Sequence, residues 1–197
     1  MITIKLPIQI DYNLAELQRQ QSCLIRWAYN RFKDGFSEKD IRLLSKKLSN
    51  IDLMDVRFRQ SAIGKARMIY KINQDKIVIF GGKQNFVDRL LDKITKKDYK
   101  RKRLRSLVCI GDAYQHGNQK FKLDIIQNNK IIFKVNRNFN IPIQLPKLRK
   151  NYEKMLYKLE EKCNSKNKED RLPYNKSLKK DTNFSYVYEF SANIDIK

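Results

Sequence analysis

A dense basic run is the part of the chain whose residue types best suit a chemical task. The thirteen residues from Lys93 to Arg105 hold eight lysines and arginines and one aspartate. Such a density of like charge repels itself unless a polyanion lies against it, and each cation that neutralises a phosphate releases counterions. The alternative is a solvated helix face, the usual explanation of a charged run. Because the imbalance is extreme, we interpret the run as a phosphate-binding surface, with Lys96, Lys97, Lys100, Arg101, Lys102, Arg103 and Arg105 as its contacts.

A glycine pair precedes this run. Gly81 and Gly82 predict a turn with unusual backbone angles, in which backbone amides can approach a phosphate or sugar closely, although an isolated pair is more often only a turn. The segment lacks the spacing and the Lys-Ser/Thr pair of a Walker A loop, so the sequence does not indicate nucleotide hydrolysis. The candidate binding residues here are Lys83, Gln84 and Asn85.

The one histidine, His116, lies in the segment 111–120 that follows the run. A single histidine without a nearby cysteine or carboxylate cluster does not make a metal site, and a role as catalytic base is disfavoured. Stacking or hydrogen bonding beside Tyr114 and Asn118 fits RNA recognition better, and Lys120 completes this set. The acidic residues are scattered among lysines, and none form a group that could hold two metal ions. We therefore expect no catalytic residue, no metal and no cofactor.

Helical spacing of apolar residues predicts three helices, from about residue 14 to 34, from 38 to 48 and from 52 to 70. Asn13 is expected to cap the first and Ser37 the second, with Asp40 completing a capping box. Leu53 and Val56 are expected to face inward from the third. The apolar face of the first comprises Leu14, Leu17, Gln21, Leu24, Ile25, Ala28 and Phe32.

The first helix also carries candidate contacts, namely Arg26, Trp27 and Arg31. Helical spacing sets Trp27 and Arg31 on one face, where they could contact bases and phosphates together. Burial of Trp27 in the core explains the sequence equally well.

Period-two patterns predict strands over 2–10, 76–80, 105–110, 121–126, 130–135, 138–145 and 186–190, with a hairpin turn at Asn128 and Asn129, helical turns at 85–91 and a helix at 147–163. The predicted fold is α+β: a small antiparallel β-barrel with an inserted three-helix unit and a C-terminal helix. Residues 1–12 and 73–146 would form the barrel, 13–72 the helical insertion, and 147–197 a helix, a polar loop and a closing strand.

The composition is that of a basic globular protein. The net charge is +22, nearly two thirds of it within residues 76–150, and 41% of the residues are apolar, enough for a core. No apolar stretch is long enough for a membrane span, and the first residues lack the pattern of a signal peptide. Three widely spaced cysteines indicate a reducing compartment. We expect a cytoplasmic protein.

Several short motifs resemble the N-terminal half of TnpB-like RNA-guided nucleases, the transposon-encoded relatives of type V CRISPR effectors. In chain order they are Leu24–Arg31, Phe80–Lys83, the basic stretch to Leu107, Ile110–Ala113, Gly117-Asn118 with Phe121, and Ile141–Pro146 with Leu148, Arg149 and Tyr152. The resemblance covers most of residues 1–190, and Arg149 joins the candidate binding residues.

In that family a split wedge barrel carries a helical recognition insertion, the order of elements predicted above. The resemblance implies that this half holds the guide RNA and its heteroduplex with target DNA and reads a short flanking DNA motif, while base pairing reads the sequence. The family's RuvC-like nuclease, with three acidic metal ligands and usually a zinc ribbon, would begin where this chain ends at Lys197. We therefore expect a non-enzymatic protein.

Several roles stay open. Under the resemblance the chain is a stand-alone repressor, a subunit completed by a separate RuvC-like nuclease chain, or an inhibitor that occupies guide RNA. A general RNA-binding barrel protein with an accidental likeness is a second class, and a nuclease in its own right is a disfavoured third. The expected partner is nucleic acid, structured RNA before DNA, and not a membrane.

Overall fold

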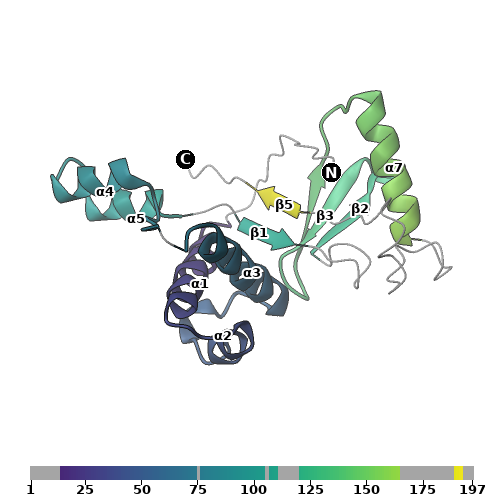
Figure 1. Cartoon of the computed structure of the whole chain (residues 1–197). Coiled ribbons are helices and arrows are strands. Elements are labelled where there is room, and N and C mark those ends of the chain that lie inside the picture. The colour runs from purple at the N-terminus through teal and green to yellow at the C-terminus, as the bar shows by residue number, and fades with distance from the viewer. Residues whose placement is uncertain (1–13, 75, 105–106, 111–119, 165–188, 193–197) are drawn as a thin grey trace. The chain divides into compact units, whose positions relative to one another are not determined.

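A computed structural model of the chain describes residues 14–74, 76–104, 107–110, 120–164 and 189–192, which form helices and antiparallel strands (Figure 1). The predicted α+β class is confirmed. The chain divides into two compact units. The described part of the helical unit is mainly residues 14–108, and that of the sheet unit mainly 109–164. The domain boundaries drawn from the sequence stay predictions.

The helical unit is built on α1 (Ala15–Lys33), α2 (Glu38–Ser45), the 3₁₀ turn η1 (Ser49–Ile51) and α3 (Val56–Ile72), which confirms the three predicted helices. Helices α1 and α3 pack against each other, since the apolar stripe of α1 recurs at helical spacing and gives a continuous buried face. Every residue predicted for that face is less than 10% exposed: Leu14, Leu17, Gln21, Leu24, Ile25, Ala28 and Phe32.

Gln21 is a polar residue on this buried face. Its side-chain Nε2 donates to the carbonyl of Val108 and its Oε1 accepts from the N–H of Val108, both at 2.6 Å. Nε2 also lies 3.3 Å from the carbonyl oxygen of Phe58. A buried amide is tolerated where its donors and acceptor are satisfied, which explains why Gln21 shares the face with aliphatic residues.

Side-chain caps set the helix starts. Ser37 Oγ accepts from the N–H of Asp40 at 3.2 Å, so the predicted Ser37 cap is confirmed; the Asp40 carboxylate accepts from the Ser37 hydroxyl at 2.6 Å. The third helix begins at Val56 rather than near residue 52, because the Asp55 carboxylate accepts from the backbone two and three residues further on, at 2.9 and 3.1 Å. The inward placement of Leu53 and Val56 was therefore wrong: they are 49% and 62% exposed, and Met54 is buried.

The strand predicted over 76–80 is wrong as well. Residues 76–80 have no strand assignment, and Ile77 is 92% exposed. β-branched residues favour an extended backbone, but a strand also needs a neighbour, and none of the described strands pairs with this segment. The turn that follows is confirmed, with Gly81 and Gly82 at φ 97° and 89°.

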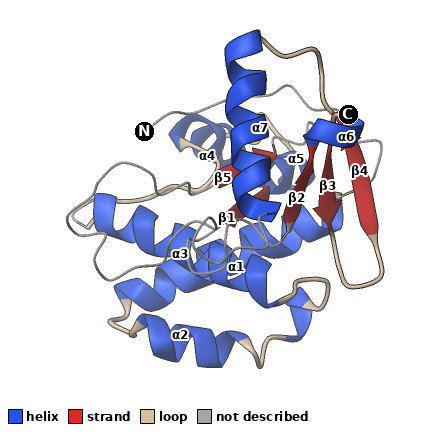
Figure 2. Cartoon of the chain, turned by 90° about the vertical axis from the view of Figure 1, so that its right-hand side faces the viewer, coloured by secondary structure: helices blue, strands red, loops and turns tan. Residues whose placement is uncertain are grey.

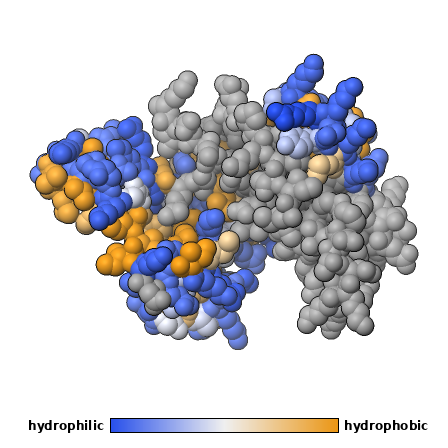
Figure 3. All heavy atoms as spheres, turned by 45° about the horizontal axis from the view of Figure 1, so that its top comes forward, coloured by the Kyte–Doolittle hydropathy of each residue, from blue (hydrophilic) through white to orange (hydrophobic). Residues whose placement is uncertain are grey.

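Two short helices follow this turn, α4 (Lys83–Leu90) and α5 (Lys96–Lys102). The predicted helical turns at 85–91 are confirmed and begin two residues earlier. Helix α5 carries most of the basic run. In the view of Figure 3, apolar side chains gather on one side of the part formed by α4 and α5, and hydrophilic side chains cover much of the rest.

The sheet unit contains β2 (Phe121–Asp124), β3 (Lys130–Lys134) and β4 (Asn140–Gln144), an antiparallel sheet in the order β2-β3-β4. Side chains on one face are buried and those on the other are largely exposed. Phe121 and Phe133 are opposite each other in the register and stack at 4.6 Å. In the described residues this sheet is open, so closure into a barrel stays a prediction.

The predicted hairpin is confirmed with a different turn. Strand β2 ends at Asp124 instead of Ile126, and Ile125–Asn128 form the helical turn α6, which lies over the end of the sheet (Figure 2). The cause lies in α7 (Lys150–Asn164): the buried Glu160 carboxylate accepts from the N–H groups of Ile125 and Ile126 at 2.6 and 3.0 Å. Both amides are thereby kept out of the strand ladder.

The remaining strands, β1 (Leu107–Ile110) and β5 (Glu189–Ala192), form a two-stranded sheet. A strand was predicted near each position, and β5 begins three residues after the predicted start. The predicted strand over 2–10 and the Asn13 cap lie outside the described residues. None of the described helices combines the length and apolar character needed to cross a membrane.

Candidate functional site

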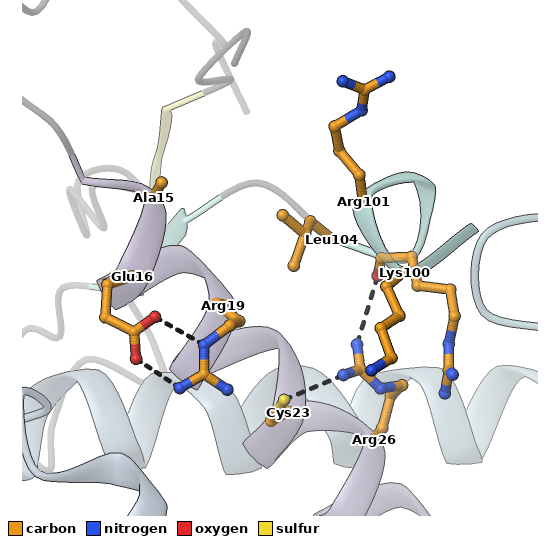
Figure 4. Close-up of a pocket in the computed structure, with 9 residues that line it drawn as sticks. Ala15, Glu16, Arg19, Cys23, Arg26, Lys100, Arg101 and Leu104 are labelled. Atoms are coloured by element: carbon orange, nitrogen blue, oxygen red, sulfur yellow. Dashed lines mark hydrogen bonds and ion pairs between the residues drawn. The ribbon is translucent and has the colours of Figure 1, made fainter. Parts of the chain in front are cut away.

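An open groove of about 660 Å³ lies between α1 and the end of α5, within the helical unit (Figure 4). Helix α1 contributes Glu16, Arg19, Cys23 and Arg26, whose spacing of three and four residues places them along one helix face. The described residues of the lining are Ala15, Glu16, Arg19, Cys23, Arg26, Lys100, Arg101, Arg103 and Leu104. Five of these nine residues are cations and one is an acid.

Helix α5 and its C-cap residue Arg103 bring three of the cations to the groove. Thr95 caps this helix: its Oγ1 accepts from the N–H of Asp98 at 3.1 Å and its hydroxyl donates to the Asp98 carboxylate at 2.7 Å. The bond from Thr95, and secondarily the charge of Arg101, lowers the pKa of Asp98. Lys100 and Arg101 occupy the last turn, where the helix dipole favours positive charge. Lys100 points from α5 toward α1, and Arg101 points away (Figure 4).

Arg26 connects the two walls of the groove. Its Nη1 donates to the carbonyl oxygen of Arg103 at 3.3 Å, and its Nη2 lies 3.1 Å from the sulfur of Cys23 (Figure 4). The side chain is half-buried. The contacts with Cys23 of α1 and with the carbonyl of Arg103 at the end of α5 hold the guanidinium in the groove, where it provides a fixed positive charge.

Glu16 is the one carboxylate among the described residues that line the groove. Arg19 Nε donates to Glu16 Oε2 at 2.6 Å, and Arg19 Nη2 pairs with the other oxygen, a bidentate arrangement (Figure 4). The bond from Arg19 is the main cause that lowers the pKa of Glu16. The acid therefore neutralises one of the five described groove cations. Arg101 pairs with Asp98 of α5 at 3.2 Å, and no ion pair is found for Lys100 or Arg103 among the described residues.

Arg103 is positioned by the glycine turn. A Cβ atom on Gly81 would lie 2.9 Å from Arg103 Cγ, so the arginine packs where only glycine leaves room. The guanidinium lies 5.5 Å from the ring centroid of Tyr99, within cation–π range. Phe80 fixes the turn against α1 through an edge-to-face contact with Tyr29 at 5.5 Å. In this structure the glycine pair makes room for an arginine side chain.

The groove brings together four of the residues predicted from the sequence: Arg26, Lys100, Arg101 and Arg103. Other predicted residues of the same unit lie outside its lining. Lys96, Lys97 and Lys102 are exposed on α5, and Lys83 and Gln84 are exposed on α4. Gln84 donates to Asp88 at 2.8 Å, and Asn85 donates to the Gly81 carbonyl at 2.6 Å.

The predicted residues elsewhere on α1 do not line the groove. Trp27 is half-buried. Arg31 pairs with Asp34 at 2.8 Å and lies 5.7 Å from the Phe36 ring, so its guanidinium is engaged locally.

In the sheet unit, Lys120 is 5% exposed and its amine donates to the Val135 carbonyl at 3.3 Å. This contact belongs to the sheet, and we leave Lys120 out of the candidate surface. Arg149 is exposed just before α7. Arg105, Tyr114, His116 and Asn118 lie outside the described residues.

Sequence reasoning missed Arg19. Its signal was the seven-residue separation from Arg26, which repeats the same helix face after two turns. The interpretation of α1 followed the neighbouring face with Trp27 and Arg31 instead. Within the residues that the structure describes, no three His, Cys, Asp or Glu side chains gather in a way that could hold a metal ion.

Comparison with known proteins gave one positive result. A protein-family model described as an SSO2105 N-terminal domain matches residues 1–188. No curated protein matches the chain, and no solved structure matches it.

Proposed function

The chain belongs to the SSO2105 N-terminal domain family, and for it we propose a non-catalytic role in nucleic-acid binding, in which the groove between α1 and α5 holds a structured, guide-like RNA or its duplex with target DNA. The observation that carries the proposal is the groove charge. Arg19, Arg26, Lys100, Arg101 and Arg103 line one open concavity, with a single carboxylate among the described lining residues. Cations gathered at this density need a counter-charge, and a phosphodiester backbone supplies one at regular spacing.

The arrangement favours an extended polyanion over a small anion. The groove is open and receives cations from two helices, and exposed lysines continue along α5 beyond it, at positions 96, 97 and 102. No aromatic ring is among the described lining residues, so this part of the groove offers no platform on which a base could stack. Recognition through the backbone and shape of a folded RNA or a duplex fits these features better than recognition of unstacked bases.

The finer parts of the proposal derive from the resemblance to TnpB-like effectors. On that basis the strands of the sheet unit belong to a wedge-like antiparallel barrel, and the protein acts in the cytoplasm as a nuclease-lacking effector fragment, a repressor, or a subunit completed by a separate RuvC-like nuclease chain. The alternatives are a general RNA-binding barrel protein and an inhibitor that occupies the guide RNA of an RNA-guided system. All of these need the basic groove.

The test is the salt dependence of binding. In a Lys100→Gln/Arg101→Gln variant, the slope of log affinity for a structured RNA against log salt should be shallower by about two counterions than in the wild type. A Lys46→Gln/Lys47→Gln variant is the matched control, because it removes two exposed charges from the end of α2, outside the groove. Equal slopes for the groove variant and the wild type would show that the groove is a solvated surface.

The identity of the bound nucleic acid separates the candidate roles. Nucleic acid that copurifies with the protein should be one discrete structured RNA if the protein is effector-like, and a heterogeneous mixture if it is a general RNA-binding protein. Cleavage of labelled DNA by the pure chain that depends on divalent metal would overturn the non-catalytic proposal.

A further inference from the structure

The hairpin of α4 and α5 leaves its apolar side chains at the surface. In the described structure no residue of either helix is buried. Leu90 and Leu91 are 66% and 60% exposed, and Phe86 is 38% exposed. An amphipathic helix of a globular protein normally turns its apolar stripe toward a core. Among the described residues the stripe faces no core, so the surface is suited to an interaction.

The apolar side chains of α4 and of its C-cap residue form one strip. Phe86 and Leu90 are four residues apart on the helix, as are the half-buried Val87 and the C-cap Leu91, so the four lie on one side of it. We call these four residues the apolar strip. The ring of Phe86 packs against the ring of Tyr99 on α5, with centroids 6.4 Å apart. This contact holds the Phe86 end of the strip against the second helix of the hairpin. The two leucines remain available.

The hairpin that carries the strip has an excess of positive charge. The three acids of the hairpin are engaged within it: Gln84 donates to Asp88, Arg89 pairs with Asp92, and Thr95 donates to Asp98. In contrast, none of the exposed lysines of the hairpin has an ion-pair partner in the described part of the chain; they are Lys83, Lys93, Lys96, Lys97, Lys100 and Lys102. An occupant of the strip must therefore combine apolar side chains with negative charge.

We propose that the apolar strip docks a partner protein through an amphipathic helical segment whose apolar side chains are bordered by Asp and Glu. Apolar residues of such a helix at positions i, i+3, i+4 and i+7 would cover Leu90 and Leu91, and its carboxylates would meet the surrounding lysines. A second copy is disfavoured as occupant because each chain carries a net charge of +22. Phosphates alone would leave the leucines uncovered. The inference adds a protein-binding surface to the proposed nucleic-acid groove.

The test uses synthetic helical peptides of about 20 residues and the full-length protein. The probe peptide carries Leu at i, i+3, i+4 and i+7 with flanking Glu; one comparison peptide has Lys for each Glu, and a second has Ser for each Leu. Fluorescence anisotropy should show binding of the Leu/Glu peptide alone. A Leu90→Ser/Leu91→Ser variant should bind it at least about tenfold more weakly, a loss within the range of a binding hot spot.

The matched control is Leu43→Ser/Leu53→Ser, which removes two leucines of similar exposure, 52% and 49%, outside the hairpin. It should leave peptide affinity within about twofold, and circular dichroism confirms that both variants are folded. Equal binding of the Leu/Glu and Ser/Glu peptides, or no effect of the hairpin variant, overturns the proposal.

Three further outcomes also overturn the proposal. A concentration-dependent dimer in sedimentation that the hairpin variant abolishes would identify a second copy as the occupant. Weaker binding of structured RNA by that variant, with peptide affinity unchanged, would identify nucleic acid. Leucine-dependent binding to anionic vesicles, without peptide binding, would identify a lipid surface. The RNA salt slope of the Lys100→Gln/Arg101→Gln variant tests the proposed function separately.

Discussion

Glu16 is the residue that limits how much positive charge the groove presents. The Glu16 carboxylate pairs with the guanidinium of Arg19, which could otherwise pair with a phosphate of the nucleic acid. We predict that Glu16→Gln raises the affinity for structured RNA and makes the salt dependence steeper by about one counterion, because Arg19 becomes free to contact a phosphate. The measurement is a binding titration at several salt concentrations.

The matched control for this substitution is Glu38→Gln. Glu38 also pairs with arginines, Arg42 and Arg67, but lies outside the groove lining. Its loss should leave the salt slope unchanged. Weaker binding by the Glu16→Gln variant would show instead that Glu16 holds Arg19 in a productive position.

The Glu16–Arg19 pair also gives stability a pH dependence of known sign. The pKa of Glu16 is lower in the folded chain than the ordinary glutamate value. A lowered folded-state pKa stabilises the fold above the unfolded pKa, and this contribution is lost as pH falls through the folded value. Because the side chain is half-exposed, the effect is screened by solvent.

Gly81 is a residue at which a single methyl group should matter. Its φ of 97° disfavours other residues, and an added Cβ would clash with Arg103. We predict that Gly81→Ala destabilises the protein by about 2 kcal/mol and weakens RNA binding by displacing Arg103. Gly64 is the control: it lies within α3 with nothing within 4 Å of an added Cβ, so Gly64→Ala should stabilise by about 1 kcal/mol. Urea unfolding distinguishes them, and equal effects would contradict the prediction.

Local sequence was sufficient to select Arg26, Lys100, Arg101 and Arg103 as candidates, since they are cations within or near basic segments. Their assembly into one groove was not predictable, because the bond from Arg26 to the Arg103 carbonyl joins residues 77 positions apart. The role of the glycine pair was likewise hidden. A sequence shows that a turn needs glycine, but not which side chain occupies the space that the missing Cβ leaves.

Glu160 on α7 decides how the hairpin of the sheet unit is shaped. Glu160→Ala would leave two N–H groups at the start of α6 without their acceptor, and we predict a loss of about 2 to 4 kcal/mol. Glu160→Gln should cost less, since its amide oxygen can still accept. The exposed neighbour Glu161 is the control, and Glu161→Ala should change stability by no more than about 0.5 kcal/mol. Urea unfolding measures all three, and a neutral Glu160→Ala variant would contradict the assigned role.

Elements were predictable where periodicity alone is strong, as in α1, and where periodicity and a local cap agree, as in α2 with its Ser37 cap. They were not predictable where the deciding contact is distant or the expected neighbour is missing. The sequence predicts that β2 continues to Ile126, because the Glu160 carboxylate that accepts from the Ile126 N–H lies 34 residues further along the chain. The segment 76–80 has the composition of a strand, but pairing is a property of the fold that no window of sequence reports.

At the scale of the whole molecule, the net charge of +22 opposes compactness through self-repulsion. We predict that the melting temperature rises as sodium chloride increases from about 0.1 to about 1 M, because the screening length falls from about 10 to about 3 Å. Bound structured RNA should raise it further by mass action. Scanning calorimetry makes both measurements. A melting temperature that falls with added chloride would show that attractive ion pairs outweigh the repulsion.

The amide of Gln21 has a consequence for assembly. In a strand, the N–H and carbonyl of one residue point to the same edge, and at Val108 both groups bind Gln21. The side chain thus imitates one peptide unit of an adjoining strand and occupies the place where a foreign strand would begin to pair. Glutamate could not donate to the carbonyl, and leucine could neither donate nor accept. Gln21 therefore blocks this position of β1 from pairing with a strand of another chain.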